Sequence, residues 1–307
     1  MVNFAFKIIW IALVTITLMA SFSRIPIGEL ASHLRIYYAI LLPICFVVAL
    51  LRKSNIAALI IGLVAVINLQ PILNLYSKAG LTQTLNFQIP IKVLEYNPCA
   101  YENQQYQKFF DYAKKQNADF VVITELDQGW YDNLKAQMPK LGYAYNYISF
   151  QDDCGVAVFS QFPIKESKAT IVQSTLKHPF LELEFDAPSH FKLIAVHAAT
   201  PRYLNERNAE FITLANIARK TTYPLILAGD FNCSPWSDNF LQILRQGKLR
   251  HASQSFGPNC TWNARWVLPL IPIDHFFCGD QVKTTNVQTG DDLGSDHLPL
   301  IGEFELP

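Results

Sequence analysis

Three long apolar runs fill most of the first 76 residues, and they constrain the fold more than any other feature of the chain. The runs cover residues 8–22, 36–51 and 56–76. A helix needs about 20 apolar residues to span a bilayer core, with a range of roughly 17–25. Residues 4–7 lengthen the first run enough, because a lysine near a helix end can extend its ammonium to the interface. We therefore predict a membrane anchor over residues 1–76, with three transmembrane helices at about 4–22, 36–52 and 56–76.

The distribution of charge supports a boundary near residue 77. The first 76 residues carry five basic side chains and one acid, Glu29. From Ser77 onward lie 20 of the 25 Lys and Arg and 24 of the 25 Asp and Glu, a net charge of about −4. A cleaved signal peptide could explain the first run, but residues 18–21 make a poor cleavage site and two more runs follow. A buried helical core of a soluble protein would carry more charge. We expect an integral protein of the cell (inner) membrane.

Loop charges leave the orientation open, because the basic residues divide equally between the two sides under the positive-inside rule. The short hairpin at Arg52 and Lys53 favours the cytoplasmic side. An odd number of spans would then place the rest of the chain outside the cytoplasm.

The cysteines give a weaker indication of compartment. Cys260 and Cys278 flank two short strand-like stretches joined by a Pro-containing loop, so they could face each other in a hairpin. A disulfide there would fit an oxidising compartment. Both states stay open at this point.

The chain from residue 87 onward alternates short apolar runs with amphipathic segments. Continuous apolar runs such as residues 118–125, ADFVVITE, are typical of buried strands. Helical spacing predicts helices over residues 104–116, 204–220 and 238–246. Strands interleaved with helices predict a layered α/β domain over residues 85–307, which is large enough for a sizeable core.

Polar side chains of a few types stand where the predicted strands end. They are Asn97, Glu125, His197, Asp230, Asn232, Asp274, Asp296 and His297. Taken singly, each has a structural explanation, since Asn and Asp often cap turns and a lone histidine is often a half-buried core residue. A carboxylate after four apolar residues, as at Glu125, needs a cation or several donors. Acids, amides and imidazoles converging on one sheet edge predict a site for a divalent cation and a phosphate.

The ordered segments EYNPC, VVITELD, GVAVFSQFPI, AVHAATP, LAGDFNCSPWS, PIDHFF and GSDHLPL resemble the endonuclease/exonuclease/phosphatase superfamily. That superfamily includes pancreatic-type deoxyribonuclease, apurinic endonucleases, sphingomyelinases and inositol-polyphosphate phosphatases. The resemblance runs from about residue 87 to the C-terminus. It implies a four-layered α/β sandwich, in which two packed mixed β-sheets are flanked by helices.

The resemblance also implies a metal site. Glu125 matches the glutamate that ligates a catalytic Mg2+, for which Mn2+ could substitute. Asn97 matches a residue that helps to hold the metal or a phosphate oxygen, and Asp296 matches a second carboxylate on the metal side. Mg2+ prefers oxygen ligands and keeps several waters, so one or two carboxylates plus substrate are sufficient.

The remaining matched residues are implied to be catalytic. Asp230 resembles the aspartate that orients the attacking water, and Asn232 resembles its neighbour on the scissile phosphate. His297 matches the histidine near the phosphate, with Asp274 as its hydrogen-bonding partner. His197 resembles a proton donor to the leaving oxygen. An aspartate behind a histidine fixes its tautomer and favours its charged form.

We therefore expect a membrane-anchored, Mg2+-dependent phosphoester hydrolase acting through in-line attack of water. An acidic soluble part without a basic run weighs against a tightly bound nuclease, because nonspecific DNA binding depends on Lys and Arg contacts to phosphates. A site near the bilayer favours a lipid or small phosphoester. Cleavage of DNA or RNA remains the alternative, and a non-catalytic binding module that keeps the fold is a further one.

Overall fold

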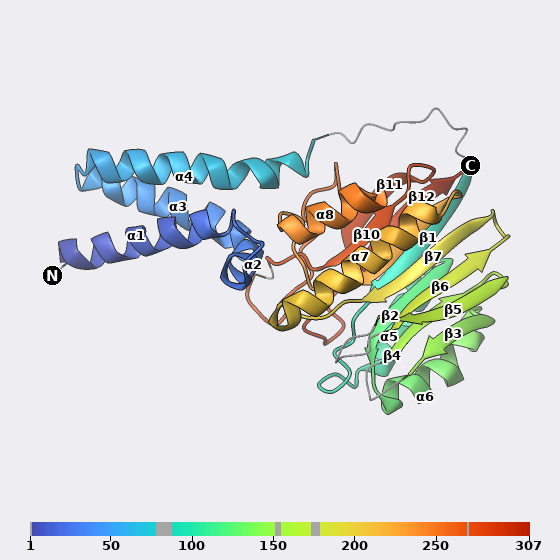
Figure 1. Ribbon diagram of the computed structural model, residues 1–307. Helices are drawn as coiled ribbons and strands as arrows, with labels where there is room; N and C mark the ends of the chain where they lie inside the picture. Colours follow the sequence, from blue (N-terminus) through green and yellow to red (C-terminus); the bar gives the residue numbers. More distant parts are fainter. Residues whose placement is uncertain (1, 78–87, 151–154, 173–178, 269) are drawn as a thin grey trace.

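The computed structural model describes residues 2–77, 88–150, 155–172, 179–268 and 270–307. The predicted start of the α/β domain at residue 85 lies outside these residues. Four helices form the N-terminal part and project from one side of a larger α/β domain (Figure 1). They are α1 (Val2–Met19), α2 (Pro26–His33), α3 (Arg35–Leu51) and α4 (Asn55–Asn74).

The described part of the α/β domain contains two six-stranded sheets. The first has the order β11-β12-β1-β2-β4-β3, with β1 (Ile89–Tyr96), β2 (Phe120–Leu126), β3 (Tyr145–Ser149), β4 (Gly155–Ser160), β11 (Lys283–Thr289) and β12 (Leu300–Leu306). The second has the order β5-β6-β7-β8-β10-β9, with β5 (Glu166–Ile171), β6 (Pro179–Phe185), β7 (Phe191–His197), β8 (Leu225–Asp230), β9 (Arg250–His251) and β10 (Asp274–Cys278). Both sheets mix parallel and antiparallel pairs.

The two sheets pack face to face over one apolar core, and helices cover their outer faces. Phe120 of β2 packs edge-on against Phe185 and Phe191 of the opposite sheet, with ring centroids 4.9 and 5.1 Å apart. Burying such a side chain stabilises the fold by about 1.5–3 kcal/mol. The helices are α5 (Tyr106–Gln116), α6 (Gln128–Gln137), α7 (Leu204–Lys220) and α8 (Asp238–Gly247), with short 3-10 turns η1 (Met138–Leu141) and η2 (Pro201–Tyr203). The fold class predicted from the sequence is thus found, helix–sheet–sheet–helix.

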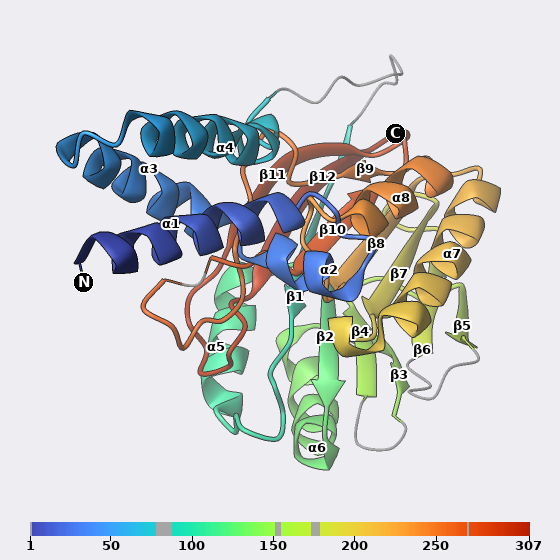
Figure 2. The same cartoon turned by 60° about the vertical axis from the view of Figure 1, so that its left-hand side comes forward.

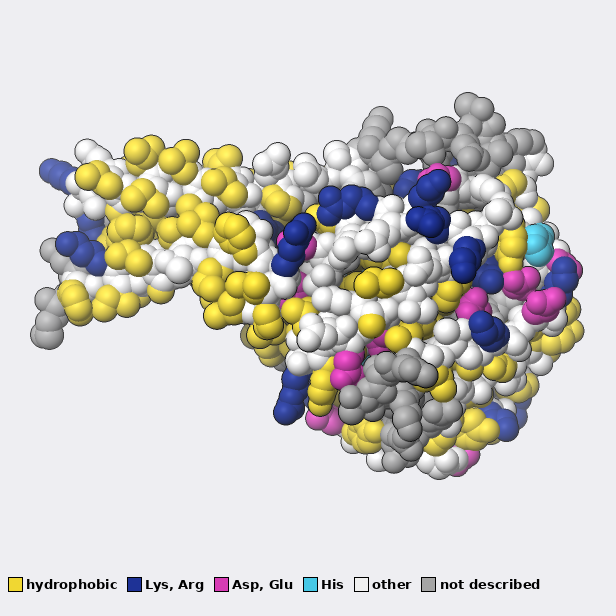
Figure 3. All heavy atoms as spheres, in the orientation of Figure 1, with side chains coloured by type: hydrophobic (Ala, Val, Ile, Leu, Met, Phe, Trp, Pro, Cys, Tyr) yellow, Lys and Arg dark blue, Asp and Glu magenta, His cyan; other side chains and the backbone are white. Residues whose placement is uncertain are grey.

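The prediction of three transmembrane helices is not supported. Among the described residues, only α4 is long and apolar enough by itself to cross a membrane. The α2–α3 pair could add a second span, but its two helices are bent by 72°. The apolar part of α1, Phe4–Met19, is shorter than a span requires. Hydrophobic side chains nevertheless dominate the visible surface of these helices, and Lys and Arg lie at the end far from the α/β domain (Figure 3).

Helix α2 docks on the α/β domain through buried polar contacts. The carboxylate of Glu29 forms an ion pair with Arg207 of α7, and both side chains are fully buried. The hydroxyl of Ser237 donates to Glu29 at 2.7 Å, and the hydroxyls of Ser32 and Ser234 lie 3.1 Å apart. Figure 2 shows α2 between the other N-terminal helices and the α/β domain. The sole acid of the apolar block therefore belongs to this interface.

The cysteine alternative is resolved against a disulfide, since Cys260 and Cys278 are both free. Cys278 is part of β10 and points into the core between the sheets. Of the two strand-like stretches between these cysteines, the one that follows Cys260 forms only isolated bridges, from Trp262 to Ile271 and to His297.

Candidate active site

Strand pairing brings three of the predicted residues to one place. In the second sheet, β7 and β8 run parallel and set His197 opposite Asp230. Strand β10 runs antiparallel to β8 and sets Asp274 opposite Asp230 from the other side. Gly229 directly precedes Asp230 and has φ +146°. A Cβ at this position would lie 1.8 Å from the Val196 carbonyl oxygen, so only glycine allows β7 and β8 to approach this closely.

Asp230 lies at the centre of the cluster. One of its carboxylate oxygens accepts the backbone N–H of Asn232 at 2.7 Å, and the other accepts the side-chain amide of Asn97 at 3.2 Å. The amide of Asn232 also donates to the Ala198 carbonyl at 3.0 Å, with the Asn232 backbone at φ +48°. Burial and the neighbouring carboxylate of Asp274 raise the pKa of Asp230 well above its ordinary value. The Asp-Phe-Asn turn therefore points a carboxylate and an amide the same way.

His297 and Asp274 form a buried pair. The Nδ1 atom of His297 lies 2.8 Å from an Asp274 oxygen, and its Nε2 atom lies 4.0 Å from Asp230. Burial alone would lower the pKa of His297, but the carboxylates of Asp274 and Asp230 outweigh it and raise the pKa to about 10. An imidazolium at neutral pH is the result, with Nε2 directed toward Asp230.

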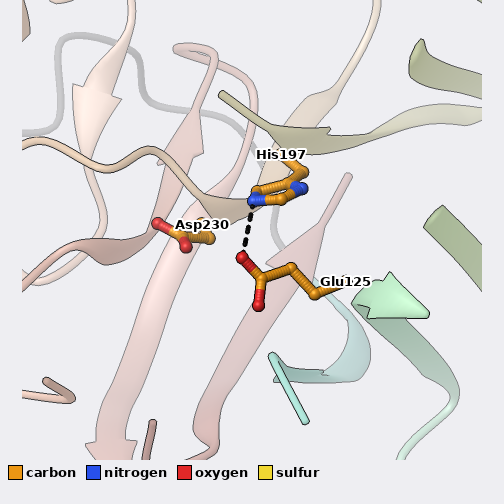
Figure 4. A group of neighbouring side chains, drawn as sticks. All are labelled: Glu125, His197 and Asp230. Atoms are coloured by element: carbon orange, nitrogen blue, oxygen red, sulfur yellow. Dashed lines mark ion pairs between the residues drawn. The ribbon is translucent and has the colours of Figure 1, made fainter. Parts of the chain in front are cut away.

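Glu125 and His197 form a second pair beside Asp230 (Figure 4). The Nε2 atom of His197 lies 3.3 Å from Glu125, which comes from the first sheet and has φ +48°. Burial would raise the pKa of Glu125, but the hydrogen bond and charge of His197 lower it to about 2. Glu125 is therefore ionised and is the acidic partner of His197.

Asp296 faces the same region. Its Oδ2 accepts the indole N–H of Trp262 at 2.9 Å, and its Oδ1 lies 4.0 Å from Nε2 of His297. All eight residues predicted from the sequence thus lie in one connected region. The assignment of a role to each of them remains a proposal.

The donor set fits a hard divalent cation. Two groups of potential ligands have their atoms within 4.8 Å of one another: Glu125, His197 and Asp230, and Asp230, Asp274 and His297. Asp230 is common to both. One oxygen of Asp274 is buried and has no hydrogen-bond partner among the described residues. Carboxylate and amide oxygens suit Mg2+ and Mn2+.

One acid of this region was missed in the sequence. Glu95 of β1 is fully buried, and neither of its carboxylate oxygens has a hydrogen-bond partner among the described residues. Burial and the charges of Asp274 and Asp230 raise its pKa well above the ordinary value. The signal was available, because residues two apart on a strand face the same side and Glu95 precedes Asn97 by two.

A pocket of about 520 Å³ opens above these residues. Its polar floor includes Glu125, Asp230, Asn232, Asp296 and His297, and its apolar wall includes Leu30, Leu34, Trp262, Trp266, Ile271 and Ile273. Leu30, His33 and Leu34 belong to α2 or follow it directly, so the N-terminal part supplies one side of the pocket. Sequence reasoning missed this contribution. No Lys or Arg side chain lines the pocket within the described ranges.

Comparison with known proteins agrees with this geometry. A family model described as "Endonuclease/Exonuclease/phosphatase family" matches residues 96–297. No curated protein sequence matches the chain.

Solved structures with the same fold extend over the α/β domain. Zebrafish (D. rerio) TDP2, complexed with a single-strand DNA product, has a TM-score of 0.59 at 15% identity and covers 70% of this chain and 98% of its own. A family protein from Bacteroides thetaiotaomicron has a TM-score of 0.61 at 16% identity, covering 71% and 98%. The catalytic domain of human Nocturnin, with a bound sulfate anion, has a TM-score of 0.55 at 18% identity, covering 72% and 97%.

Proposed function

The chain belongs to the endonuclease/exonuclease/phosphatase family, whose members are phosphoester hydrolases, and on this premise we propose that it is a membrane-anchored hydrolase that uses Mg2+. The observation that carries the proposal is the convergence of carboxylates, amides and imidazoles from both sheets on Asp230. A structural role would not require so many buried ionisable groups in contact, since each buried charge is costly unless it is paired.

The proposed metal ligands are Glu125, Asn97 and Asp296. Bound there, a divalent cation would supply positive charge for the non-bridging oxygens of the phosphate. Glu125 suits this role because it is ionised and partly open to the pocket. Mn2+ has the same preference for oxygen ligands and should replace Mg2+.

The proposed catalytic groups act on water and the phosphate. Asp230 accepts a hydrogen bond from the attacking water and orients it, and Asn232, whose amide donates to Asp230 at 3.3 Å, lies beside the scissile phosphate. His297, held charged by Asp274, stabilises the negative charge that develops in the transition state. His197 donates a proton to the leaving oxygen, a role that its position opposite Asp230 supports.

The membrane anchor is supported by the composition of the N-terminal helices. Helix α4 has the length and apolar character of a span, and apolar side chains cover the projecting helices. Arg52 and Lys53 lie in the turn between α3 and α4, at the opposite end of these helices from the α/β domain. With this short basic hairpin on the cytoplasmic side and α4 as a span, the α/β domain is extracytoplasmic.

The pocket bears on the choice of substrate. Nucleic-acid sites depend on Lys and Arg contacts to the phosphate backbone, and none lines this pocket among the described residues. A lipid or another small phosphoester is therefore favoured over DNA or RNA. Nuclease activity is the alternative, supported by the fold shared with TDP2. A non-catalytic module would have no need of the paired buried charges.

Hydrolysis of bis-p-nitrophenyl phosphate by the full chain in detergent tests the proposal. We expect turnover with Mg2+ or Mn2+ and none with EDTA. Asp230→Ala and His297→Ala should each lower kcat by about 10²–10⁴-fold. Asp291→Asn, at an exposed carboxylate outside the pocket, is the matched control and should keep wild-type activity. Equal activity of the two site variants and the wild type would refute the assignment.

A further inference from the structure

Exposed apolar side chains lie at one side of the pocket, and we call them the apolar rim: Leu30 and Trp266, which line the pocket, and Val267 and Leu268, which follow Trp266 in the chain. Val267 is 98% exposed, and Leu30 and Trp266 are 55% and 45% exposed. Leu30 and Trp266 therefore face both the solvent and the interior of the site. Exposed apolar groups gathered at a pocket mouth mark an interaction surface.

The apolar rim is attached to the N-terminal helices. Tyr37, near the start of α3, donates its hydroxyl to the Leu268 carbonyl at 2.7 Å. Its ring packs edge-on against Trp266 at a centroid distance of 6.0 Å. Tyr and Trp side chains concentrate at membrane–water interfaces, where one end is apolar and the other is hydrated. The rim thus lies where the apolar helices meet the α/β domain.

The interior of the pocket has an apolar part and a polar part. Its wall of Leu34, Trp262 and Ile271 is apolar, and its floor carries Asp230 and His297. A phosphate on the floor would leave one ester group directed along the wall toward the rim. The volume of about 520 Å³ exceeds the needs of a phosphate alone and is typical of a site for a small organic ligand.

We propose that the apolar rim contacts the membrane interface and that the substrate is an amphiphilic phosphoester drawn from the bilayer, with its alkyl part against Leu30 and Trp266. The inference rests on the proposed hydrolase function. The argument for a bilayer over a protein partner is the continuity of the rim with α3, through Tyr37, and with α2. Water attacks phosphorus, and the P–O bond to the leaving group breaks as that oxygen takes a proton.

A homologous series of p-nitrophenyl alkyl phosphates tests this, with methyl and octyl esters kept below their critical micelle concentrations and the full chain at one fixed detergent concentration. Each methylene that is buried contributes about 0.8 kcal/mol, which is about 4-fold in affinity. Burial of only three methylenes predicts a kcat/KM about 50-fold higher for the octyl ester. Leu30→Asn and Trp266→Asn should each reduce this octyl-to-methyl ratio by about 10-fold.

The matched control is Ile212→Asn in α7, which alters an exposed apolar side chain outside the apolar rim and should preserve the ratio. A second readout uses the full chain reconstituted in phosphatidylcholine vesicles that contain p-nitrophenyl hexadecyl phosphate. There Val267→Asp should lower the rate of hydrolysis at least 5-fold.

The outcomes separate the two proposals. If no ester is hydrolysed in the presence of Mg2+, methyl included, the hydrolase function itself fails. If the methyl ester is hydrolysed but the ratio is near one, or is unchanged in both pocket variants, the inference is wrong and the function stands. A single-stranded oligonucleotide cleaved with a higher kcat/KM than the octyl ester would also overturn it.

Discussion

Replacing Glu29 by glutamine should destabilise the protein and impair its site from a distance. Glu29 and Arg207 are both fully buried, so the variant leaves an arginine charge in the interior without its carboxylate. Removing one member of such a pair costs about 3–5 kcal/mol. For a chain of this size, about 2–4 °C is lost per kcal/mol, which gives a melting temperature lower by about 6–20 °C.

The effect should extend to activity, because Arg207 also donates a hydrogen bond to the Asn232 carbonyl. Asn232 holds its left-handed backbone within this network. Once Arg207 is free to reorient, the Asn232 amide should lose its alignment with Asp230. We expect kcat for bis-p-nitrophenyl phosphate to fall about 10-fold or more at a temperature well below the transition, with KM less affected.

Thermal unfolding of the full chain in detergent, followed by circular dichroism, measures the first effect. The control is Asp291→Asn, which breaks an exposed ion pair with Lys115 and should cost less than about 1 kcal/mol. A double variant, Glu29→Leu with Arg207→Met, should recover part of the lost stability because no unpaired charge remains. If Glu29→Gln melted within 2 °C of the wild type, the reasoning from the buried pair would be refuted.

Three further predictions concern pH, metal and orientation. Asp274→Asn should lower the pKa of His297 from about 10, because the Asp274 carboxylate is the largest of the charges that raise it. The imidazolium is present below its pKa, so the alkaline limb of the kcat profile should move to lower pH, and an unmoved limb would exclude His297 as its source. Saturating Mg2+ should raise the wild-type melting temperature by about 5–10 °C and leave Glu125→Gln nearly unchanged, as thermal scans with Mg2+ or EDTA would reveal. An impermeant thiol reagent should label Lys53→Cys from the cytoplasmic face of membrane vesicles, and labelling from the opposite face would contradict the proposed orientation.

The polar residues of the site could be recognised from the sequence because each stands at the end of an apolar run. Strand pairing then brings these residues together: because β7 and β8 are parallel neighbours and both end in a polar residue, His197 lies opposite Asp230. The helix predicted over residues 204–220 is found with the same bounds. Elements and residues marked by a local sequence pattern of this kind can be predicted without knowledge of tertiary contacts.

Other parts depended on contacts that no local pattern encodes. Helix α6 buries only Trp130 and Leu134 of its ten residues, so its apolar periodicity is too weak to predict it. Glu29 stood out as the lone acid of an apolar block, but its partner Arg207 is 178 residues away. The apolar runs likewise overstated the membrane anchor, because the apolar part of α1 ends at Met19 and α3 has only 17 residues, with a bend of 72° between it and α2.

Helix α2 also determines which fragments of the protein can be tested for activity. A fragment that starts after α4 would retain every proposed catalytic residue, yet Arg207 would keep its charge with no acid to neutralise it. The pocket would at the same time lose Leu30 and Leu34 and stand open on that side. Weak turnover by such a fragment would therefore reflect the loss of the pocket wall that α2 supplies. It would not measure the catalytic activity of the intact chain.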